Sequence, residues 1–306
     1  MLSSAIGLMP GLTLPERTLV TGAGGQLGRT LLRQAPAHTQ VAGFARSELD
    51  IADSKAIASC LDREQPDLLI NTAAYTAVDQ AEADPTAAQR TNAEAPGVLA
   101  RACAERGIRF FHVSTDFVFD GTQSHPYAPS DTPKPLGVYG ASKRAGEVAV
   151  ANAAGDALIL RTGWVYSAGA GNFLNTMLRL HAEREELHVV ADQVGTPTAA
   201  PSLGAALWAA AARPGLSGIY HFSDAGVCSW YDFAVAIGEE GVATGLLPRA
   251  ARVIPIATED YPTPADRPSY SVLDKRATWR EFELSPVHWR IRLRETLAEL
   301  KRDQHV

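Results

Sequence analysis

The sequence contains few cysteines, no long apolar run and no excess of positive charge. Its three cysteines, Cys60, Cys103 and Cys228, are far apart and odd in number, so they predict neither a disulfide framework nor a paired Cys-x-x-Cys metal motif. No stretch of about 20 apolar residues exists that could span a bilayer. These absences favour a cytoplasmic protein without a membrane partner.

The charge balance is acidic. The chain holds 28 Lys and Arg residues against 34 Asp and Glu residues, which gives a formal net charge of −6, and no basic run offsets it locally. Because such a field repels polyanions, we expect no nucleic-acid partner. A small anionic ligand must therefore be held by a local device, such as the N-terminus of a helix or a single Arg.

Short apolar runs alternate with longer mixed segments from Arg17 onward, a rhythm typical of βαβ units. The unbroken hydrophobicity of the runs favours strands of a parallel sheet that is covered on both faces. The expected strands are 18–21, 41–45, 68–72, 110–114 and 158–161, and the expected helices are 26–34, 54–64, 86–106 and 289–302. The sequence therefore predicts an α/β fold, with a doubly wound parallel sheet of the Rossmann type.

A glycine motif stands where the first strand passes into the first helix. It reads Gly22-Ala23-Gly24-Gly25-Gln26-Leu27-Gly28. Residues without a Cβ allow a tight turn, a close approach of the backbone to a pyrophosphate and close contact of helix with strand. An ordinary glycine-rich turn is the alternative, but a strand before the motif and a helix after it favour dinucleotide binding.

The end of the second strand indicates which dinucleotide is bound. An acid there would accept from the 2′-hydroxyl of NAD, whereas an Arg would pair with the 2′-phosphate of NADP. The sequence reads Ala45-Arg46-Ser47, which favours NADPH over NADH. Glu48, just beyond the strand, is the counter-argument.

The rhythm loosens after Arg161, where Gly-rich and Pro-rich segments become frequent. We therefore expect residues 17–166 to form mainly an NADP-binding Rossmann domain. Residues 1–16 read as an N-terminal extension. Residues 167–306 read mainly as a smaller C-terminal substrate-binding region whose chain crosses back into the first domain.

A tyrosine and a lysine lie four residues apart in Tyr139-Gly140-Ala141-Ser142-Lys143. On a helix these positions share a face, so the hydroxyl and the ammonium can meet at one point. Tyrosine has an ordinary pKa of about 10, and a nearby cation would lower the pKa and make Tyr139 a useful proton donor. The pair alone is more often a solvated helix pair, but the glycine motif and Thr115 at a strand end favour catalysis.

Five further blocks occur in order along the chain: 71–79 (NTAAYTAVD), 114–121 (STDFVFDG), 161–166 (RTGWVY), 192–198 (DQVGTPT) and 261–268 (YPTPADRP). From Arg17 to its C-terminal helix, the chain resembles the extended short-chain dehydrogenases/reductases and, among them, the dTDP-4-dehydrorhamnose reductase family. The resemblance implies NADPH-dependent reduction of the C4 ketone of a nucleotide-linked 4-keto-6-deoxyhexose, chiefly dTDP-4-dehydro-L-rhamnose, in the biosynthesis of a cell-surface polysaccharide. A dTDP-linked sugar is thus the expected partner, and a homodimer is left open.

The resemblance assigns roles only where residues match. It implies that Tyr139 donates a proton, that Lys143 holds the nicotinamide ribose and tunes Tyr139, and that Thr115 bonds the substrate carbonyl. Asp116 and Trp164 would contact the sugar. From the motif and the resemblance together, the expected cofactor-binding residues are Gly22, Gly25, Gln26, Leu27, Gly28, Arg46, Asp50, Ile51, Ala74, Tyr75, Thr76, Tyr139 and Lys143.

Two departures from the family bear on cofactor and metal. Ala45 stands where relatives often have Asp, which strengthens the case for NADPH. Family members have been associated with Mg²⁺, but the sequence shows no metal-ligand spacing, and Arg290 stands where an acid is common. No metal site is predicted, and a role for Mg²⁺ is left open.

The block 261–268 offers a local anion donor. Three prolines stiffen it, which lowers the entropy that Arg267 would lose on binding a diphosphate. The planar guanidinium also suits phosphate oxygens. The alternative is that Arg267 pairs with Asp266 or another acid and only anchors the loop.

Two other functions compete with reduction. One is a nucleotide-sugar epimerase or 4,6-dehydratase, but dehydratases resembling this chain place Glu after Thr-Asp, where this chain has Phe117. The other is a non-catalytic regulatory subunit similar to the beta subunit of methionine adenosyltransferase. Retention of Thr115, Tyr139 and Lys143 favours an enzyme.

Overall fold

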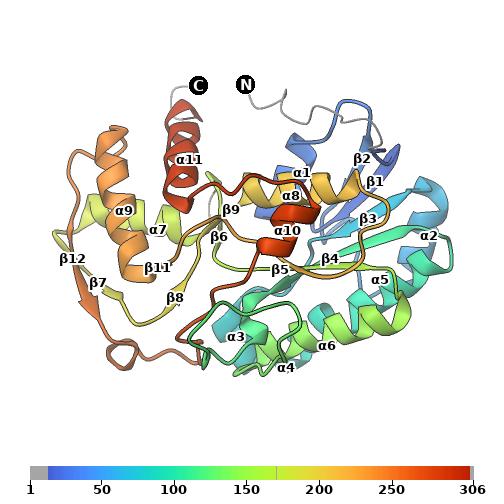
Figure 1. The fold of residues 1–306 in the computed structure, drawn as a ribbon, viewed down its shortest axis with the longest axis horizontal. Helices are drawn as coiled ribbons and strands as arrows, with labels where there is room; N and C mark the ends of the chain where they lie inside the picture. Colours follow the sequence, from blue (N-terminus) through green and yellow to red (C-terminus); the bar gives the residue numbers. More distant parts are fainter. Residues whose placement is uncertain (1–12, 170, 304–306) are drawn as a thin grey trace.

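The computed structural model describes residues 13–169 and 171–303. Most of the predicted N-terminal extension, residues 1–12, lies outside the described residues. The chain forms a larger lobe around a central sheet and a smaller lobe beside it, on the right and left of Figure 1.

The central sheet has six parallel strands in the order β10-β5-β4-β3-β1-β2. The strands are β1 (Arg17–Thr21), β2 (Gln40–Phe44), β3 (Leu68–Asn71), β4 (Arg109–Thr115), β5 (Leu158–Thr162) and β10 (Gly218–His221). The five predicted strands are confirmed to within one or two residues. The sixth, β10, pairs with β5 from far along the chain, so it returns to the sheet after the smaller lobe has been built.

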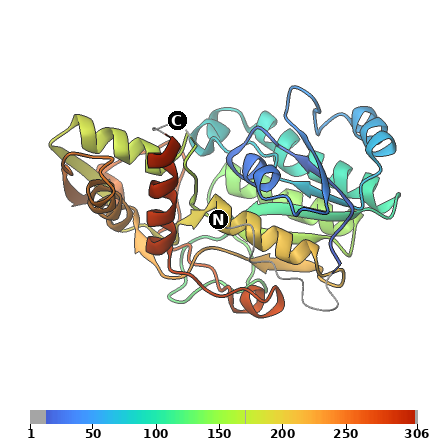
Figure 2. The ribbon, with the colours of Figure 1, turned by 90° about the horizontal axis from the view of Figure 1, so that it is seen from above.

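Helices cover both faces of the sheet, which explains why the strands carry apolar side chains on both faces. On one face lie α1 (Gln26–Arg33) and α8 (Ala200–Ala211), which share an apolar core with the strands. On the other lie α2 (Ser54–Glu64), α5 (Ala95–Ala104) and α6 (Val138–Ala153), which form a second core. Figure 1 shows α1 and α8 above the sheet and α5 and α6 below it, and Figure 2 looks down on the side that carries α8. The doubly wound α/β prediction is confirmed.

The predicted helix over 86–106 is confirmed as an unbroken helix over 85–104, but its middle is π-helical and not α-helical. The chain forms α3 (Val78–Ala83), α4 (Pro85–Gln89), a π-helical segment η1 (Arg90–Glu94) and then α5. Pro96 has no N–H to donate to the turn before it, and the N–H of Ala95 reaches back to the carbonyl of Arg90, five residues earlier. The wider turn accommodates the missing donor.

The smaller lobe consists of three helices and a two-stranded parallel sheet. These are α7 (Phe173–Glu183), α9 (Trp230–Ala243), α11 (Trp289–Asp303), β7 (Glu186–Val190) and β12 (Arg252–Ile256). They share an apolar core of their own, to which Leu174, Phe233 and Leu297 contribute. The predicted C-terminal helix is confirmed as α11.

Short strand pairs lie between the main elements of the two lobes. The parallel pair β6 (Val165–Tyr166) and β9 (Thr198–Ala199) follows directly on β5 and leads into α8. The antiparallel pair β8 (Val194–Gly195) and β11 (Cys228–Ser229) leads into α9.

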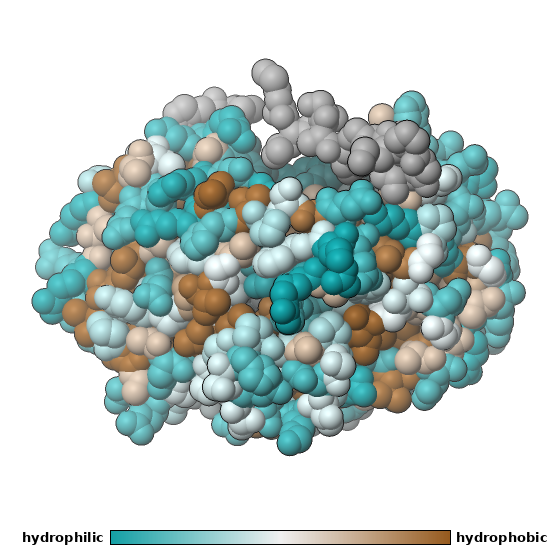
Figure 3. Space-filling model, viewed as in Figure 1, coloured by the Kyte–Doolittle hydropathy of each residue, from teal (hydrophilic) through white to brown (hydrophobic). Residues whose placement is uncertain are grey.

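Large apolar side chains on the surface are scattered. Tyr261, Val227 and Ile291 are among the most exposed. On the face of the molecule drawn in Figure 3, apolar residues are interspersed with hydrophilic ones. In the part of the chain that the structure describes, no helix is both long enough and apolar enough to cross a membrane.

The glycine motif forms a very close backbone contact. Gly22 has a φ of +72°, and a Cβ on it would lie 2.6 Å from the nitrogen of Ala73, just after β3. A Cβ on Gly28 would overlap the carbonyl oxygen of Gly22 and lie 2.7 Å from the Cα of Ala23. The turn therefore brings β1, α1 and the end of β3 together with no space for side chains.

We expect Gly28→Ala to destabilise the fold, because the new methyl would press on backbone atoms that cannot swing away. Overpacking of this kind costs about 1–3 kcal/mol, which thermal unfolding would detect. Gly155→Ala is the matched control, because a Cβ there meets no atom within 4 Å. Equal melting temperatures for the two variants would show that the turn tolerates the methyl.

Candidate active site

A cavity of about 680 Å³ opens at the carboxyl ends of β1, β3 and β4, where the smaller lobe meets the sheet. The chain leaves β1 toward β2 on one side and returns to β3 on the other, so this is a topological switch point, the usual ligand position in such sheets. All the predicted site residues line this one cavity: Gly22, Gly25, Gln26, Leu27, Gly28, Arg46, Asp50, Ile51, Ala74, Tyr75, Thr76, Thr115, Asp116, Tyr139, Lys143, Trp164 and Arg267.

The N-terminus of α1 points its backbone donors at one end of the cavity. Gly25 is the N-cap residue, and it supplies no side chain to bond these donors. Free N–H groups and the positive end of the helix dipole suit an anion. Gln26 ties this turn to the smaller lobe, since its Oε1 accepts from the Ser167 hydroxyl and the Asn172 amide, both at 2.8 Å. The cradle therefore fits the pyrophosphate of a dinucleotide.

The end of β2 carries the groups that would choose between dinucleotides. Glu48 Oε2 accepts from the N–H of Ala45 at 2.8 Å, so Glu48 closes the turn around Arg46. Asp50 pairs with Arg90 at 2.7 Å. Arg90 also lines the cavity and was missed, because its position in the middle of an expected helix gives no sign that it faces a ligand.

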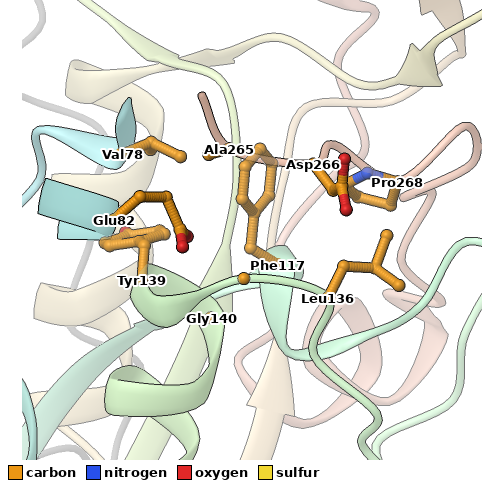
Figure 4. Close-up of a pocket in the computed structure, with 10 residues that line it drawn as sticks. Val78, Glu82, Phe117, Leu136, Tyr139, Gly140, Ala265, Asp266 and Pro268 are labelled. Atoms are coloured by element: carbon orange, nitrogen blue, oxygen red, sulfur yellow. The ribbon is translucent and has the colours of Figure 1, made fainter. Parts of the chain in front are cut away.

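The predicted catalytic residues come from β4 and α6. Thr115 ends β4, where its Oγ1 accepts from the N–H of Phe117 at 3.2 Å and donates to Asp116 Oδ1 at 3.1 Å. Tyr139 lies in the first turn of α6, and the ring of Phe117 meets it edge-on at 5.9 Å between centroids. Figure 4 shows the small pocket beside Tyr139 that Phe117 and Glu82 line.

Burial dominates the electrostatics of Tyr139. It raises the pKa of Tyr139 to about 12, the charge of Asp116 raises it further, and the Thr115 hydroxyl acts in the opposite direction. The expectation that Lys143 would lower this pKa is therefore not met. The Lys143 ammonium donates to the carbonyl of Val113 at 2.6 Å, and burial lowers the pKa of Lys143 to about 8.

The start of α6 is held by a neighbouring helix. Glu82 of α3 accepts from the N–H of Val138 at 2.7 Å, one residue before Tyr139. A carboxylate at this end of a helix is favoured by the helix dipole. The contact fixes where Tyr139 enters the cavity.

Trp164 stands between the lobes in an unusual conformation. Its φ is +52°, and its indole stacks on that of Trp230 with 3.4 Å between centroids and 4° between planes. A strained backbone of this kind persists only where surrounding contacts hold it. Trp230, at the start of α9, also lines the cavity. Nothing in the sequence marks Trp230 as a cavity residue, since a lone Trp gives no sign of what it faces.

Arg267 is engaged in its own loop and with α3. It pairs with Asp79 at 2.9 Å and donates to the carbonyl of Ala265 at 3.1 Å. The anchoring contact foreseen as an alternative is therefore present, with Asp79 rather than Asp266 as the acid. Arg267 also lines the cavity, so the anchor holds its guanidinium at the wall.

Arg290, which stands where relatives often carry an acid, forms ion pairs within the chain. Arg290 pairs with Glu240 at 2.8 Å and also with Glu239. Among residues 13–169 and 171–303, no three His, Cys, Asp or Glu side chains come together so as to hold a metal ion.

Comparison with known proteins identifies the family. The family model described as the RmlD substrate binding domain matches residues 16–302. The dTDP-4-dehydrorhamnose reductase of Burkholderia thailandensis is 46% identical over 284 residues, covering 90% of this chain and 95% of that protein. The chain belongs to the dTDP-4-dehydrorhamnose reductase family. This membership confirms the resemblance and favours a reductase over an epimerase, a dehydratase or a regulatory subunit.

Solved structures of the dTDP-4-dehydrorhamnose reductase family share the fold. The protein from Clostridium acetobutylicum superposes with a TM-score of 0.88 at 35% identity, covering 93% of this chain and 99% of that one. The protein from Bacillus anthracis, solved in complex with NADP, gives a TM-score of 0.87 at 35% identity, again covering 93% and 99%.

We expect the buried carboxyl of Asp116 to make stability depend on pH. Burial raises its pKa to about 6, against an ordinary 3.8. Between pH 4 and pH 6 the folded state therefore keeps a proton that the unfolded state has lost, so this contribution to stability is present below that window and is lost as pH rises through it. Asp116→Asn removes the titration.

Chemical denaturation at several pH values measures this effect. Across the window, the unfolding free energy of the native chain should fall by about 1–3 kcal/mol more than that of Asp116→Asn. The exposed Asp156→Asn is the control. Parallel curves for the native chain and Asp116→Asn would contradict the account.

Proposed function

We propose that this protein reduces the C4 ketone of dTDP-4-dehydro-L-rhamnose with NADPH, giving dTDP-L-rhamnose. The observation that carries the proposal is that Tyr139, Lys143 and Thr115 share one cavity with a glycine cradle suited to a dinucleotide. Family membership supports the substrate, since relatives bear the name dTDP-4-dehydrorhamnose reductase. Further support for the cofactor is the NADP complex of the Bacillus anthracis protein.

The cofactor would lie along the carboxyl edge of the sheet. Backbone donors of Gln26 and Leu27 would hold its pyrophosphate, since the Gly25 N–H already donates to the Gly22 carbonyl, and Arg46 would pair with the 2′-phosphate. The remaining expected contacts are Asp50 and Ile51 at the adenine, and Ala74, Tyr75 and Thr76 past the end of β3. When bound, NADPH supplies a hydride.

Tyr139 would supply the proton that completes the reduction. Its raised pKa keeps it protonated at neutral pH, so it stays a donor. As the ketone oxygen gains negative charge it becomes far more basic than a phenolate, and transfer from Tyr139 becomes favourable. The Thr115 hydroxyl would bond the same oxygen and stabilise the developing charge.

Both regions of the chain would contribute to the substrate site. Asp116 and Trp164 would contact the sugar, with Trp230 behind the indole. Arg267 would bind the diphosphate, because the protein's net charge of −6 offers no general attraction for it. We infer that region 17–166 binds the cofactor and also supplies Asp116 and Trp164 to the substrate, while region 167–306 supplies Trp230 and Arg267.

Purified protein mixed with NADPH and dTDP-4-dehydro-L-rhamnose should consume the reduced cofactor, and Tyr139→Phe should lower kcat by about 10²–10⁴-fold because it lacks the acid. The affinity for NADPH should hold, since the ring is kept. A variant with more than half the native kcat would refute the role of Tyr139. No net NADPH consumption by the native protein would favour an epimerase or dehydratase.

Arg46→Ala should weaken NADPH binding by about 1.5–3 kcal/mol, the value of a charge-assisted pair with the 2′-phosphate. NADH has no such phosphate, so it serves as the internal control. Titration of both cofactors by fluorescence gives the two Kd values. Equal losses for both would make Arg46 a structural residue.

Arg267→Ala should raise KM for the nucleotide sugar about tenfold or more, since about 1.4 kcal/mol corresponds to one decade. Asp79→Asn is the matched control, because it removes the anchor and keeps the guanidinium. If Arg267 binds the diphosphate, only the first variant should raise KM strongly. If both variants lower the melting temperature and neither changes KM, Arg267 has only a structural role in the loop.

A further inference from the structure

A chain of buried polar groups runs beneath the cavity from β1 to α6. It passes from Thr21 at the end of β1, through Asn71 at the end of β3 and His112 of β4, to Lys143. Asn71 and His112 are fully buried, and Lys143 is 2% exposed. Buried polar groups of this kind must satisfy one another, so each proton in the chain has a determined place.

The side-chain amide of Asn71 has only one workable orientation. The N–H of Ala73 points at its Oδ1 from 3.1 Å, and the Thr21 hydroxyl donates to the same atom at 2.7 Å. A backbone N–H can only donate, so the atom it faces must be the amide oxygen. The Asn71 nitrogen is then the atom that faces His112.

This orientation determines the tautomer of His112. The Asn71 Nδ2 lies 3.0 Å from the Nδ1 of His112 and can only donate to it. Nδ1 must therefore be unprotonated. Burial and the neighbouring Lys143 hold the pKa of His112 well below its ordinary range, so the ring is neutral and its single proton sits on Nε2.

The Nε2–H of His112 faces Lys143. The distance from Nε2 to the Lys143 Nζ is 3.4 Å, and Nζ also donates to the carbonyl of Val113. A neutral amine has a lone pair that can accept from Nε2–H, whereas an ammonium has only donors to present. The hydrogen-bond network is thus complementary to the neutral amine form of Lys143.

Few charges around Lys143 oppose this preference. Glu147, one turn along α6, favours the ammonium. Its carboxylate is already held by Arg161 at 2.7 Å and by Arg144 at 3.0 Å. Across the cavity, the charge of Asp116 acts on Tyr139.

We propose that Asn71 and His112 are positioning residues for the reaction, which together present a ring N–H to Lys143 and favour its neutral amine. The proposal rests on the proposed reductase function for its consequence and on the described hydrogen bonds for its basis. The pKa of Lys143, lowered to about 8, agrees with it.

A lysine that gives up a proton readily is a proton source for Tyr139. After Tyr139 has protonated the substrate oxygen, water in the cavity would give a proton to Tyr139 and take one from Lys143, so that an N–H bond of Lys143 breaks and the O–H bond of Tyr139 re-forms. Lys143 is left as a neutral amine, which accepts from His112. Water in the cavity later returns the proton to Lys143.

The tautomer can be measured on the native protein without substrate. Long-range ¹H–¹⁵N correlation spectra of histidine-labelled protein distinguish a protonated ring nitrogen from an unprotonated one. We expect His112 to carry its proton on Nε2 from pH 6 to pH 9. A proton on Nδ1, or on both nitrogens, would overturn the proposal.

Asn71→Asp should reverse the arrangement with little change in shape. One oxygen of the new carboxylate can still accept from Thr21 and Ala73. The second oxygen can only accept, so the Nδ1 of His112 must carry the ring proton. The Nε2 of His112 is then unprotonated and presents a hydrogen-bond acceptor to Lys143. The new hydrogen bond and charge should favour the ammonium of Lys143. The apparent pKa at which kcat falls on the alkaline side, here called the alkaline limb, should therefore rise by about one pH unit or more. The spectra should show the ring proton moved to Nδ1.

Thr21→Val is the matched control, because the Ala73 N–H alone still orients Asn71, so the alkaline limb should stay in place. Should Asn71→Asp fail to fold, His112→Leu takes its place. Loss of the Nε2–H should likewise raise the apparent pKa of the alkaline limb. An unmoved limb in a folded variant would refute the proposal. Absence of reductase activity would refute the proposed function instead, while the spectra of the native protein would still decide the tautomer.

Discussion

Where β1 passes into α1, three segments of backbone meet with no space for a side chain. Gly22 adopts a left-handed conformation against Ala73, and Gly28 packs on the same turn. Because the helix starts so close to the strand, its N-terminal donors face the opening between β1 and β3. The cavity and its anion cradle follow from this contact, and Gln26 in the same turn bonds the smaller lobe through Ser167 and Asn172.

The second feature of the site is that Asp116 and Lys143 are buried and Tyr139 is half-buried. Burial raises the pKa of Tyr139 and Asp116 and lowers the pKa of Lys143, so all three favour their neutral forms. Neutral groups cost less to bury than charged ones. The site can therefore bury these groups and still hold a proton donor, Tyr139, at neutral pH.

The sequence predicted the sheet well because its buried parallel strands contain unbroken apolar runs, as in residues 68–70 of β3 and 158–160 of β5. It missed β10, whose four residues Gly-Ile-Tyr-His carry no strand pattern of their own and are ordered by pairing with β5. It also missed the π-helical turn at Arg90, which depends on one proline in an otherwise helical segment.

At the site, local motifs predicted residues that line one cavity, but not what each of them contacts. Trp230, Asp79 and His112 reach the site from distant segments, and no spacing rule connects them to it. The direction of the Tyr139 pKa shift was predicted wrongly for the same reason. Helical spacing places Lys143 on the same face, but it does not reveal how deeply the hydroxyl is buried or that the ammonium turns to Val113.

The central claim is that this cavity carries a hydride from NADPH to the C4 carbon of a nucleotide-linked ketosugar. The most direct measurement is a single turnover with NADPH deuterated at both positions of nicotinamide C4, followed by NMR of the sugar product. The account predicts one deuterium on C4 of dTDP-L-rhamnose for each cofactor oxidised. Product without deuterium, deuterium on another carbon, or cofactor left reduced would contradict it.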